Sequence, residues 1–192
     1  MNKFKVTKTS IEGLVVVEPT VFGDARGFFM ETYAERDFVD LGIDARFVQD
    51  NHSSSSRGVL RGLHFQNSHT QGKLIRVVRG AVLDVALDLR PESPTFGHYE
   101  SALLTAENKR QFFVPKRFAH GFLTIEDGTE FLYKCTDYYC AAGDGGVRWD
   151  DSAIGIDWQF ERWGIDPSTL NLSPKDLAQP LMGELDWTKV WQ

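Results

Sequence analysis

Short runs of hydrophobic residues dominate the chain, and their length and residue types predict β-strands rather than helices. Turn-forming sequences such as VRGA, RPESPTFG and EDGTE separate these runs. Two short helices are expected, one over Tyr33–Leu41 and one that begins in the sequence SPKD. Eight strands are predicted, over Leu14–Glu18, Phe47–Asp50, Val59–Gln66, Lys73–Val78, Ala81–Leu89, Gln111–Val114, Phe122–Ile125 and Glu130–Tyr139.

Eight or more short strands indicate an all-β fold, built as a sandwich, a barrel or a jelly roll. No repeat, low-complexity segment or linker divides the 192 residues, so we expect a single domain over residues 1–192. The 14 Phe, 5 Trp and 17 Gly favour a sheet-rich core over a helical bundle.

The charge and the cysteines narrow the classes of partner and the compartment. A formal net charge of -6 argues against nucleic acid or an anionic membrane as the main partner. No apolar run has the length of a signal peptide or of a membrane span. Cys135 and Cys140 lie five residues apart in a run that resembles a strand, so alternation points them to opposite faces and they are poorly placed for a disulfide or a shared metal. We therefore expect a cytoplasmic protein with reduced thiols.

Several polar side chains interrupt runs that otherwise resemble core. Such groups are costly to bury unless they converge on a shared wet cavity, and convergence would build a cationic, hydrogen-bonding pocket inside a barrel mouth. In the sequence RGVLRGLHFQ, strict alternation places Arg61 and His64 on opposite faces, and both can line one pocket only if Gly62 forms a bulge or kink. The polar side chains are Arg61, His64, Lys73, His120 and Tyr133.

Each of these groups also has a purely structural interpretation. His64 can be a core histidine bonded to the backbone, Lys73 a solvated strand end and His120 part of a turn. Tyr133 can be a core residue with its hydroxyl at the rim. In LSPKD, Asp176 fits a capping box in which Ser173 is the N-cap.

A metal site is not expected. Metal-binding double-stranded β-helix proteins need a His-x-His pair with a following carboxylate, and a distant His. The candidate segment here is His64-Phe65-Gln66, which lacks the second ligand, and His120 alone cannot hold a metal.

Six stretches, in order along the chain, closely resemble the dTDP-4-dehydrorhamnose 3,5-epimerase family. The resemblance runs from about residue 4 to about residue 182. It implies a cupin-type jelly roll (a double-stranded β-helix) without metal or other cofactor, in a homodimer that exchanges N-terminal strands. The stretches are DARGFFMETY (24–33), FVQDNHSSSSRGVLRGLHFQ (47–66), QGKLIRVVRGAVLDVALDLR (71–90), ENKRQFFVPKRFAHGF (107–122), EFLYKCTDYY (130–139) and LSPKD (172–176).

The resemblance also implies a reaction: inversion of C3 and C5 of dTDP-4-dehydro-6-deoxy-D-glucose, which gives dTDP-4-dehydro-L-rhamnose. It implies that His64 is the base with Asp176 behind it, Tyr133 the acid, and Lys73 the ligand of the 4-keto oxygen. The further substrate contacts that it implies are Arg26, Glu31, Gln49, Asn51, Arg61, His120, Asp144 and Lys175, with Tyr139 stacked on thymine. The chain departs from the family pattern in CAAGDGG (140–146), which replaces a Pro-Glu-rich loop. Within this stretch, Asp144 stands where the family usually has a Glu.

The residue types suit that chemistry. A proton beside a ketone is acidic because the enolate spreads its charge onto oxygen, and a fixed ammonium such as that of Lys73 stabilises the charge as it develops. Histidine is a base suited to neutral pH, and a carboxylate behind it fixes its tautomer. Inversion needs a proton donor on the opposite face of the sugar, where a Tyr hydroxyl can serve.

Two alternatives stay open. An epimerase of the same fold could act at C3 only, although Tyr133 favours double epimerisation because the C5 step is the one expected to need it. A non-catalytic nucleotide-sugar binder or cupin interaction module is a different class. The joint presence of His64, Lys73, Tyr133 and Asp176 argues against it.

Overall fold

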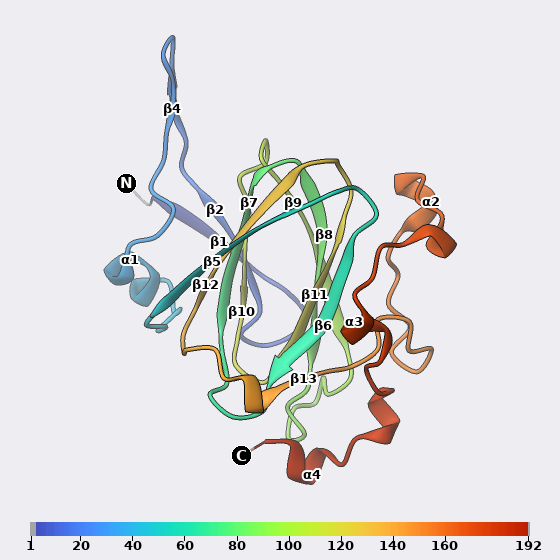
Figure 1. Cartoon of the computed structure of the whole chain (residues 1–192). Coiled ribbons are helices and arrows are strands. Elements are labelled where there is room, and N and C mark those ends of the chain that lie inside the picture. Colours follow the sequence, from blue (N-terminus) through green and yellow to red (C-terminus); the bar gives the residue numbers. More distant parts are fainter. Residues whose placement is uncertain (1–2, 192) are drawn as a thin grey trace.

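Two antiparallel β-sheets packed face to face form the body of the structure, a computed structural model that describes residues 3–191 (Figure 1). The prediction of an all-β jelly roll with a few short helices is confirmed. The first sheet contains, in spatial order, β1 (Phe4–Lys8), β2 (Val15–Pro19), β10 (Gln111–Val114), β7 (Lys73–Arg79), β12 (Thr129–Cys135) and β5 (Gln49–Ser55). The second contains β13 (Asp144–Gly146), β6 (Leu60–Gln66), β11 (Phe118–Thr124), β8 (Ala81–Asp88) and β9 (Tyr99–Thr105).

The main core lies between the two sheets. Alternate residues of β7, such as Ile75 and Val77, face alternate residues of β8, such as Val82 and Ala86, in one buried cluster. Phe112, Phe122 and Phe131 fill the middle of this cluster. Every residue of β8 is buried, because a second layer of chain covers its outer face.

The C-terminal third supplies that second layer. Trp158 is buried against β8 and β11, and its indole N–H donates to the Trp149 carbonyl at 3.0 Å. Figure 1 shows the C-terminal helices along the outside of the five-stranded sheet. None of the helices in residues 3–191 is long and apolar enough to cross a membrane. The helices of this C-terminal layer are α2 (Phe160–Trp163), η2 (Pro167–Thr169), α3 (Pro174–Leu177), η3 (Met182–Glu184) and α4 (Trp187–Val190).

The N-terminal part covers the outer face of the six-stranded sheet only partly. Helix α1 (Glu35–Asp40) buries Phe38 against Phe4 and Tyr33, both at 5.0 Å between ring centroids. Ahead of it, a hairpin of β3 (Phe22–Asp24) and β4 (Gly27–Phe29) projects away from the body (Figure 1).

Most of the predicted strands are present, but several boundaries differ. The run predicted over Glu130–Tyr139 ends at Cys135, because its neighbours β5 and β7 stop there and offer no further partner. The prediction that Cys140 continues this strand-like run is therefore wrong. Cys140 precedes the short helix η1 (Ala141–Gly143). Both cysteines are free thiols. Strands β1, β9 and β13 and the hairpin were not predicted.

Strand β6 contains the bulge on which the pocket depends. His120 of β11 pairs with His64, but Phe122 pairs with Arg61, so two residues of β6 lie opposite Gly121 alone. Gly62 has φ +119°, and a Cβ there would lie 2.5 Å from the Gly121 Cα. The extra residue brings Arg61 and His64 to the same side of the sheet, and both line one cavity.

Substitution Gly62→Ala should lower the free energy of unfolding by about 2–4 kcal/mol, because it combines a positive φ with a backbone clash. Gly58→Ala is the matched control, since Gly58 has φ +81° but nothing within 4 Å of a Cβ. This control should lose only about 1 kcal/mol. Urea unfolding followed by tryptophan fluorescence measures both. Equal losses would show that the close approach of β6 and β11 is not the cause.

Candidate active site

A cavity of about 310 Å³ opens between the two sheets. Both sheets supply polar groups to it, and aromatic side chains form the rest of its wall. The polar residues that line it are Asn51, His52 and Ser53 of β5, Arg61 and His64 of β6, Lys73 of β7, His120 of β11 and Tyr133 of β12. Three different strands, β6, β7 and β12, therefore bring His64, Lys73 and Tyr133 to one space.

His64 is hydrogen-bonded to a carboxylate from the C-terminal layer. Its Nε2 lies 2.6 Å from Asp176 Oδ1. The imidazole is partly exposed to the cavity, whereas Asp176 is only 3% exposed. The carboxylate therefore holds the ring from behind and leaves the other ring nitrogen free to meet a ligand.

Asp176 also caps helix α3, so the structural and the chemical interpretations of this residue both apply. The Asp176 N–H donates to the Ser173 hydroxyl oxygen at 3.1 Å and Asp176 Oδ2 accepts the Ser173 N–H at 3.4 Å, which together form a capping box. The Ser173 hydroxyl also donates to Oδ2 at 2.6 Å. Asp176 Oδ1 also accepts the Gly62 N–H at 3.2 Å. Burial alone would raise the pKa of this carboxyl, but the hydrogen bonds from His64 and Ser173 outweigh it and lower the pKa to about 2.

Lys73 and Tyr133 are neighbours inside the cavity, with the Lys73 Nζ 6.0 Å from the Tyr133 ring centroid. Burial lowers the pKa of the Lys73 ammonium, and the nearby Cys135, Asp84 and Asp144 oppose that shift. Burial raises the pKa of the Tyr133 phenol to about 12. Tyr133 therefore keeps its proton at neutral pH and can act as a donor.

Asp84 is a site residue that the sequence analysis missed. It is fully buried on β8, and its two carboxylate oxygens lie 2.9 and 3.0 Å from His120 Nε2. Burial raises the pKa of Asp84 and lowers that of His120, so the low dielectric opposes full charge separation in the pair. The signal was present in AVLDVALD, where all eight residues are buried and Asp84 is a charge in the middle of an otherwise apolar run that ends at Asp88.

A hydrogen-bonded chain of residues leads from the cavity toward its rim. Asn51 lines the cavity, and its Oδ1 accepts from Gln49 Nε2 at 3.1 Å. Gln49 Oε1 in turn accepts the backbone N–H of Tyr139 at 3.0 Å. Arg61 lies on the other side of the cavity, where it donates to the Ser55 hydroxyl at 3.2 Å.

Three more of the expected substrate contacts form a cluster at the rim. Tyr139, which is 57% exposed, donates through its hydroxyl to Asp144 Oδ2 at 2.9 Å. The Lys175 ammonium is paired with the same oxygen. These residues do not line the cavity itself but lie where β13 and α3 meet.

Arg26 and Glu31 lie apart from the cavity of their own chain. Arg26 is at the tip of the β3–β4 hairpin, 90% exposed at the side chain and paired with Asp24. Glu31 follows the hairpin and pairs with Lys3 at 2.7 Å. Neither residue lines the cavity that holds His64.

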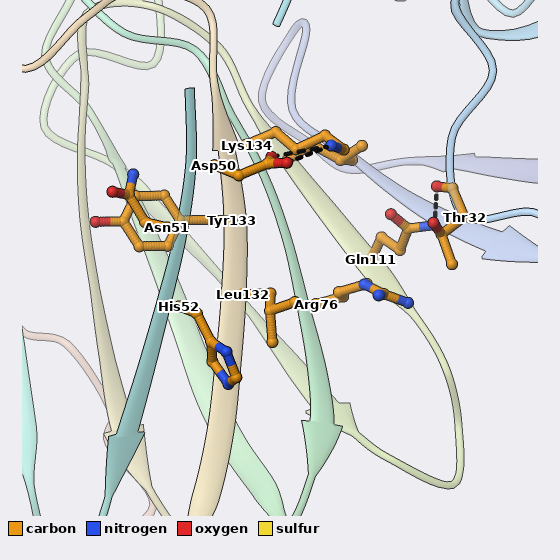
Figure 2. Close-up of a pocket in the computed structure, with 10 residues that line it drawn as sticks. Thr32, Asp50, Asn51, His52, Arg76, Gln111, Leu132, Tyr133 and Lys134 are labelled. Carbon is orange, nitrogen blue, oxygen red and sulfur yellow. Dashed lines mark hydrogen bonds and ion pairs between the residues drawn. The ribbon is translucent and has the colours of Figure 1, made fainter. Parts of the chain in front are cut away.

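A second hollow, of about 210 Å³, lies largely on the opposite face of the six-stranded sheet. Figure 2 shows Asn51 and Tyr133 on one side of β5 and β12, with Lys134, Arg76 and Gln111 on the other. Lys134 is paired with Asp50 at 2.9 Å, and Gln111 Nε2 donates to the Thr32 carbonyl at 2.8 Å. The Asp50–Lys134 and Gln111–Thr32 contacts join polar groups within this hollow, and neither His64 nor Lys73 lines it.

Across the residues that the structure describes, no three His, Cys, Asp or Glu side chains gather in a way that could hold a metal ion. Each of the three cavity histidines has Nε2 beside a carboxylate: His52 beside Glu130, His64 beside Asp176 and His120 beside Asp84.

Comparisons with known proteins identify the family of the chain. The family model described as dTDP-4-dehydrorhamnose 3,5-epimerase matches residues 8–184. The protein of that name from Salmonella typhimurium is 50% identical over 181 residues, which cover 93% of this chain and 96% of the relative.

Two solved structures are also similar. The RmlC epimerase of Legionella pneumophila, in complex with dTDP-4-keto-L-rhamnose, is 44% identical with a TM-score of 0.91, and the match covers 98% of this chain and 97% of that one. ChmJ of Streptomyces bikiniensis, a 3'-monoepimerase in complex with dTDP-quinovose, is 33% identical with a TM-score of 0.83, and the match covers 91% of this chain and 86% of that one.

The lowered pKa of Asp176 predicts a contribution to stability that depends on pH. The pKa is about 2 in the folded chain against an ordinary value of 3.8, so the ionised carboxylate stabilises the fold above about pH 4, and this stabilisation is lost as the pH falls through 2. The stability advantage of the wild type over Asp176→Asn should shrink by about 2 kcal/mol between about pH 5 and about pH 2. Chemical denaturation at each pH measures it. An advantage that does not change with pH would contradict this account.

Proposed function

We propose the reaction of this chain from the premise that it belongs to the dTDP-4-dehydrorhamnose 3,5-epimerase family and is an epimerase. It inverts C3 and C5 of dTDP-4-dehydro-6-deoxy-D-glucose and forms dTDP-4-dehydro-L-rhamnose, for deoxysugar biosynthesis. The observation that carries the proposal is the convergence of His64, Lys73 and Tyr133 on one cavity, with Asp176 behind the imidazole.

His64 acts as the base. Asp176 occupies Nε2, so the other ring nitrogen accepts the proton from the carbon beside the ketone. The carboxylate, whose pKa is lowered to about 2, stays ionised at any working pH. Its negative charge stabilises the imidazolium that forms when the proton is taken up.

Lys73 stabilises the enolate. When the C–H bond breaks, its electron pair moves to the 4-keto oxygen, and a buried ammonium placed there offsets the new charge in a medium of low dielectric. Asp84 and His120 support this role: the Asp84 carboxylate contributes negative charge that opposes loss of the Lys73 proton, and it holds the His120 ring at 2.9 Å.

Tyr133 completes the inversion. Its phenol, with a pKa raised to about 12, donates a proton to the same carbon from the opposite face. The imidazolium then loses its proton to solvent and the phenolate regains one, so each inversion is redox-neutral and needs no cofactor. The two carbons that flank the ketone are treated in turn.

The nucleotide part binds at the rim. The ring of Tyr139 stacks on thymine, while Arg61 and Lys175 supply positive charge for the diphosphate. Gln49 and Asn51 connect Tyr139 at the rim to the cavity by hydrogen bonds. Binding energy obtained this far from the reacting carbons orients the sugar in the cavity.

The active form is a homodimer in which the hairpin of one copy completes the site of the other. The hairpin exposes Phe22, Phe28 and Phe29 by 51%, 60% and 66%, which is unfavourable for a projecting arm in water. A hollow lined by Phe28, Phe29 and Val78 continues onto the outer face of the six-stranded sheet, which gives a second copy an apolar surface to cover. In such a dimer Arg26 and Glu31 reach the partner's cavity, which they do not line in their own chain.

A cytoplasmic location fits the free thiols. Cys135 is buried and its sulfur accepts a hydrogen bond from Asn51 at 3.4 Å, beside the cavity. A reducing compartment keeps such a thiol intact.

The second candidate function is epimerisation at C3 only. Similarity to ChmJ, a 3'-monoepimerase, keeps this alternative in view. The protonated, half-buried Tyr133 favours the double reaction, because the C5 step is the one expected to need that donor.

Solvent deuterium decides between these reactions. Purified protein incubated in D₂O with dTDP-4-dehydro-6-deoxy-D-glucose should place label at both C3 and C5, as read by NMR. His64→Ala should lower the rate by about 10²–10⁴-fold because the positioned base is lost. Tyr133→Phe should lose label and inversion at C5 more than at C3. His98→Ala and Tyr33→Phe are the matched controls, since neither residue lines the cavity.

Label at C3 alone in the wild type would favour the second candidate. Absence of label at both carbons would contradict either reaction.

The hairpin predicts the assembly state. The wild type should sediment as a dimer of the 21.7 kDa chain. The double variant Phe28→Ser/Phe29→Ser should raise the Kd of the dimer by at least about 100-fold, because it removes two buried apolar rings from each copy. Leu181→Ser, a similarly apolar exposed position outside the hairpin, should leave the dimer intact. A wild-type monomer at micromolar concentration would contradict the proposal.

A further inference from the structure

One carboxylate oxygen joins two groups at the rim that come from different segments. Asp144 Oδ2 accepts the Tyr139 hydroxyl at 2.9 Å and is paired with the Lys175 ammonium. The Asp144 side chain is 18% exposed, against 46% for Lys175 and 57% for the whole Tyr139 residue. The carboxylate is thus the most enclosed member of a cluster whose other two members face solvent.

The backbone around Asp144 has little freedom to move. Asp144 pairs with Gln66, and Gly146 pairs with His64, so β13 lies directly beside the strand that bears the proposed base. A Cβ on Gly145 would lie 2.9 Å from the Phe65 ring, and a Cβ on Gly143 would overlap the Ser68 side chain. Because glycines on both sides allow this close approach, the Asp144 carboxylate is held at a fixed place on the rim.

The two partners of Asp144 lead to the two halves of the proposed site. Tyr139 is tied by its backbone N–H to Gln49 and therefore to the cavity residue Asn51. Lys175 immediately precedes Asp176, whose Oδ1 holds His64 at 2.6 Å. Asp144 therefore connects the aromatic wall to the helical turn that carries the carboxylate of the His64 pair.

Direct contact of Asp144 with a dTDP-sugar is not what this arrangement favours. A carboxylate beside a diphosphate would be repelled unless it were neutralised, and here Lys175 neutralises it. The Tyr139 hydroxyl and the Lys175 ammonium already occupy Asp144 Oδ2, and the hydrogen bond raises the pKa of the Tyr139 phenol. Aspartate is one methylene shorter than the glutamate that is usual at this position. The Asp144 carboxylate therefore reaches less far toward a bound substrate than a glutamate would.

We propose that Asp144 is a positioning residue for nucleotide binding, which holds the Tyr139 ring and the Lys175 ammonium in place and acts through them rather than by touching substrate. The inference rests on the proposed function, because it takes thymidine diphosphate as the ligand of the rim. It assigns to Asp144 an effect on nucleotide affinity and on KM, with little effect on the proton transfers at His64 and Tyr133.

A double-mutant cycle tests this role. The Kd of dTDP is measured by calorimetry for the wild type, Asp144→Ala, Tyr139→Phe and the double variant. Asp144→Ala should weaken dTDP by about 10-fold, because it frees both partners. Tyr139→Phe keeps the ring but loses the bond, and should weaken dTDP by about 3-fold. The double variant should match Asp144→Ala, because its two changes remove the same bond.

Two further variants separate this role from a structural one. Asp144→Glu keeps the charge and the acceptor and should stay within about 3-fold of wild type, whereas the isosteric Asp144→Asn, which loses the charge that pairs with Lys175, should resemble Asp144→Ala. In all of these variants KM for the nucleotide sugar should follow Kd, while kcat for deuterium exchange changes by less than about 3-fold.

Multiplied effects in the double variant, an unchanged Kd in Asp144→Ala, or a loss confined to kcat would each overturn the inference. Calorimetry with dTDP does not depend on turnover. A wild type that binds dTDP but exchanges no deuterium would therefore contradict the proposed reaction and leave the role of Asp144 to be decided by the cycle.

Discussion

The hydrogen bond between Asp176 and His64 is the contact on which the rest of the site depends. It joins the outer C-terminal layer to a strand of the sandwich, across 112 residues of sequence. The same carboxylate caps helix α3 through Ser173 and accepts the N–H of Gly62 at the bulge. One buried carboxylate thus holds the start of helix α3, the bulge at Gly62 and the His64 imidazole together. A change at any one of these points therefore alters the position of the other two.

Burial sets the protonation states of the other groups. The same apolar surroundings raise the pKa of Tyr133, lower that of Lys73 and raise that of Asp84. The negative charge of Asp84 opposes part of these shifts, because it raises the pKa of both Lys73 and His120. The exclusion of water between the two sheets keeps the phenol protonated but disfavours the Lys73 cation, which the negative charge of Asp84 supports.

Local pattern was a good guide where an element has one apolar face or an unusual residue, and a poor guide elsewhere. The bulge at Gly62 followed from the conflict between strict alternation and two polar residues in RGVLRGLHFQ. Strand β9 has the sequence YESALLT, in which no run of β-branched residues announces a strand; it forms because β8 offers it a full set of backbone partners. All seven residues of strand β5, QDNHSSS, are polar, and pairing with β12 makes it a strand. Asp84 was overlooked because a charge in an apolar run has no visible partner until the histidine across the sheet is in place.

The sequence by itself determined the all-β class, the short helices at α1 and α3, the capping box at Ser173 and the family to which the chain belongs, because each of these is written in neighbouring residues or in motifs kept in order. Only the tertiary structure decided which polar residues share a cavity, that Asp84 holds His120, that Asp144 binds Tyr139 and Lys175 together, and that Arg26 and Glu31 lie outside the cavity of their own chain. The physical reason is that hydrogen bonds and ion pairs between distant segments depend on distances of a few ångströms. Those distances are set by strand order and register, which the pattern of any single segment does not contain.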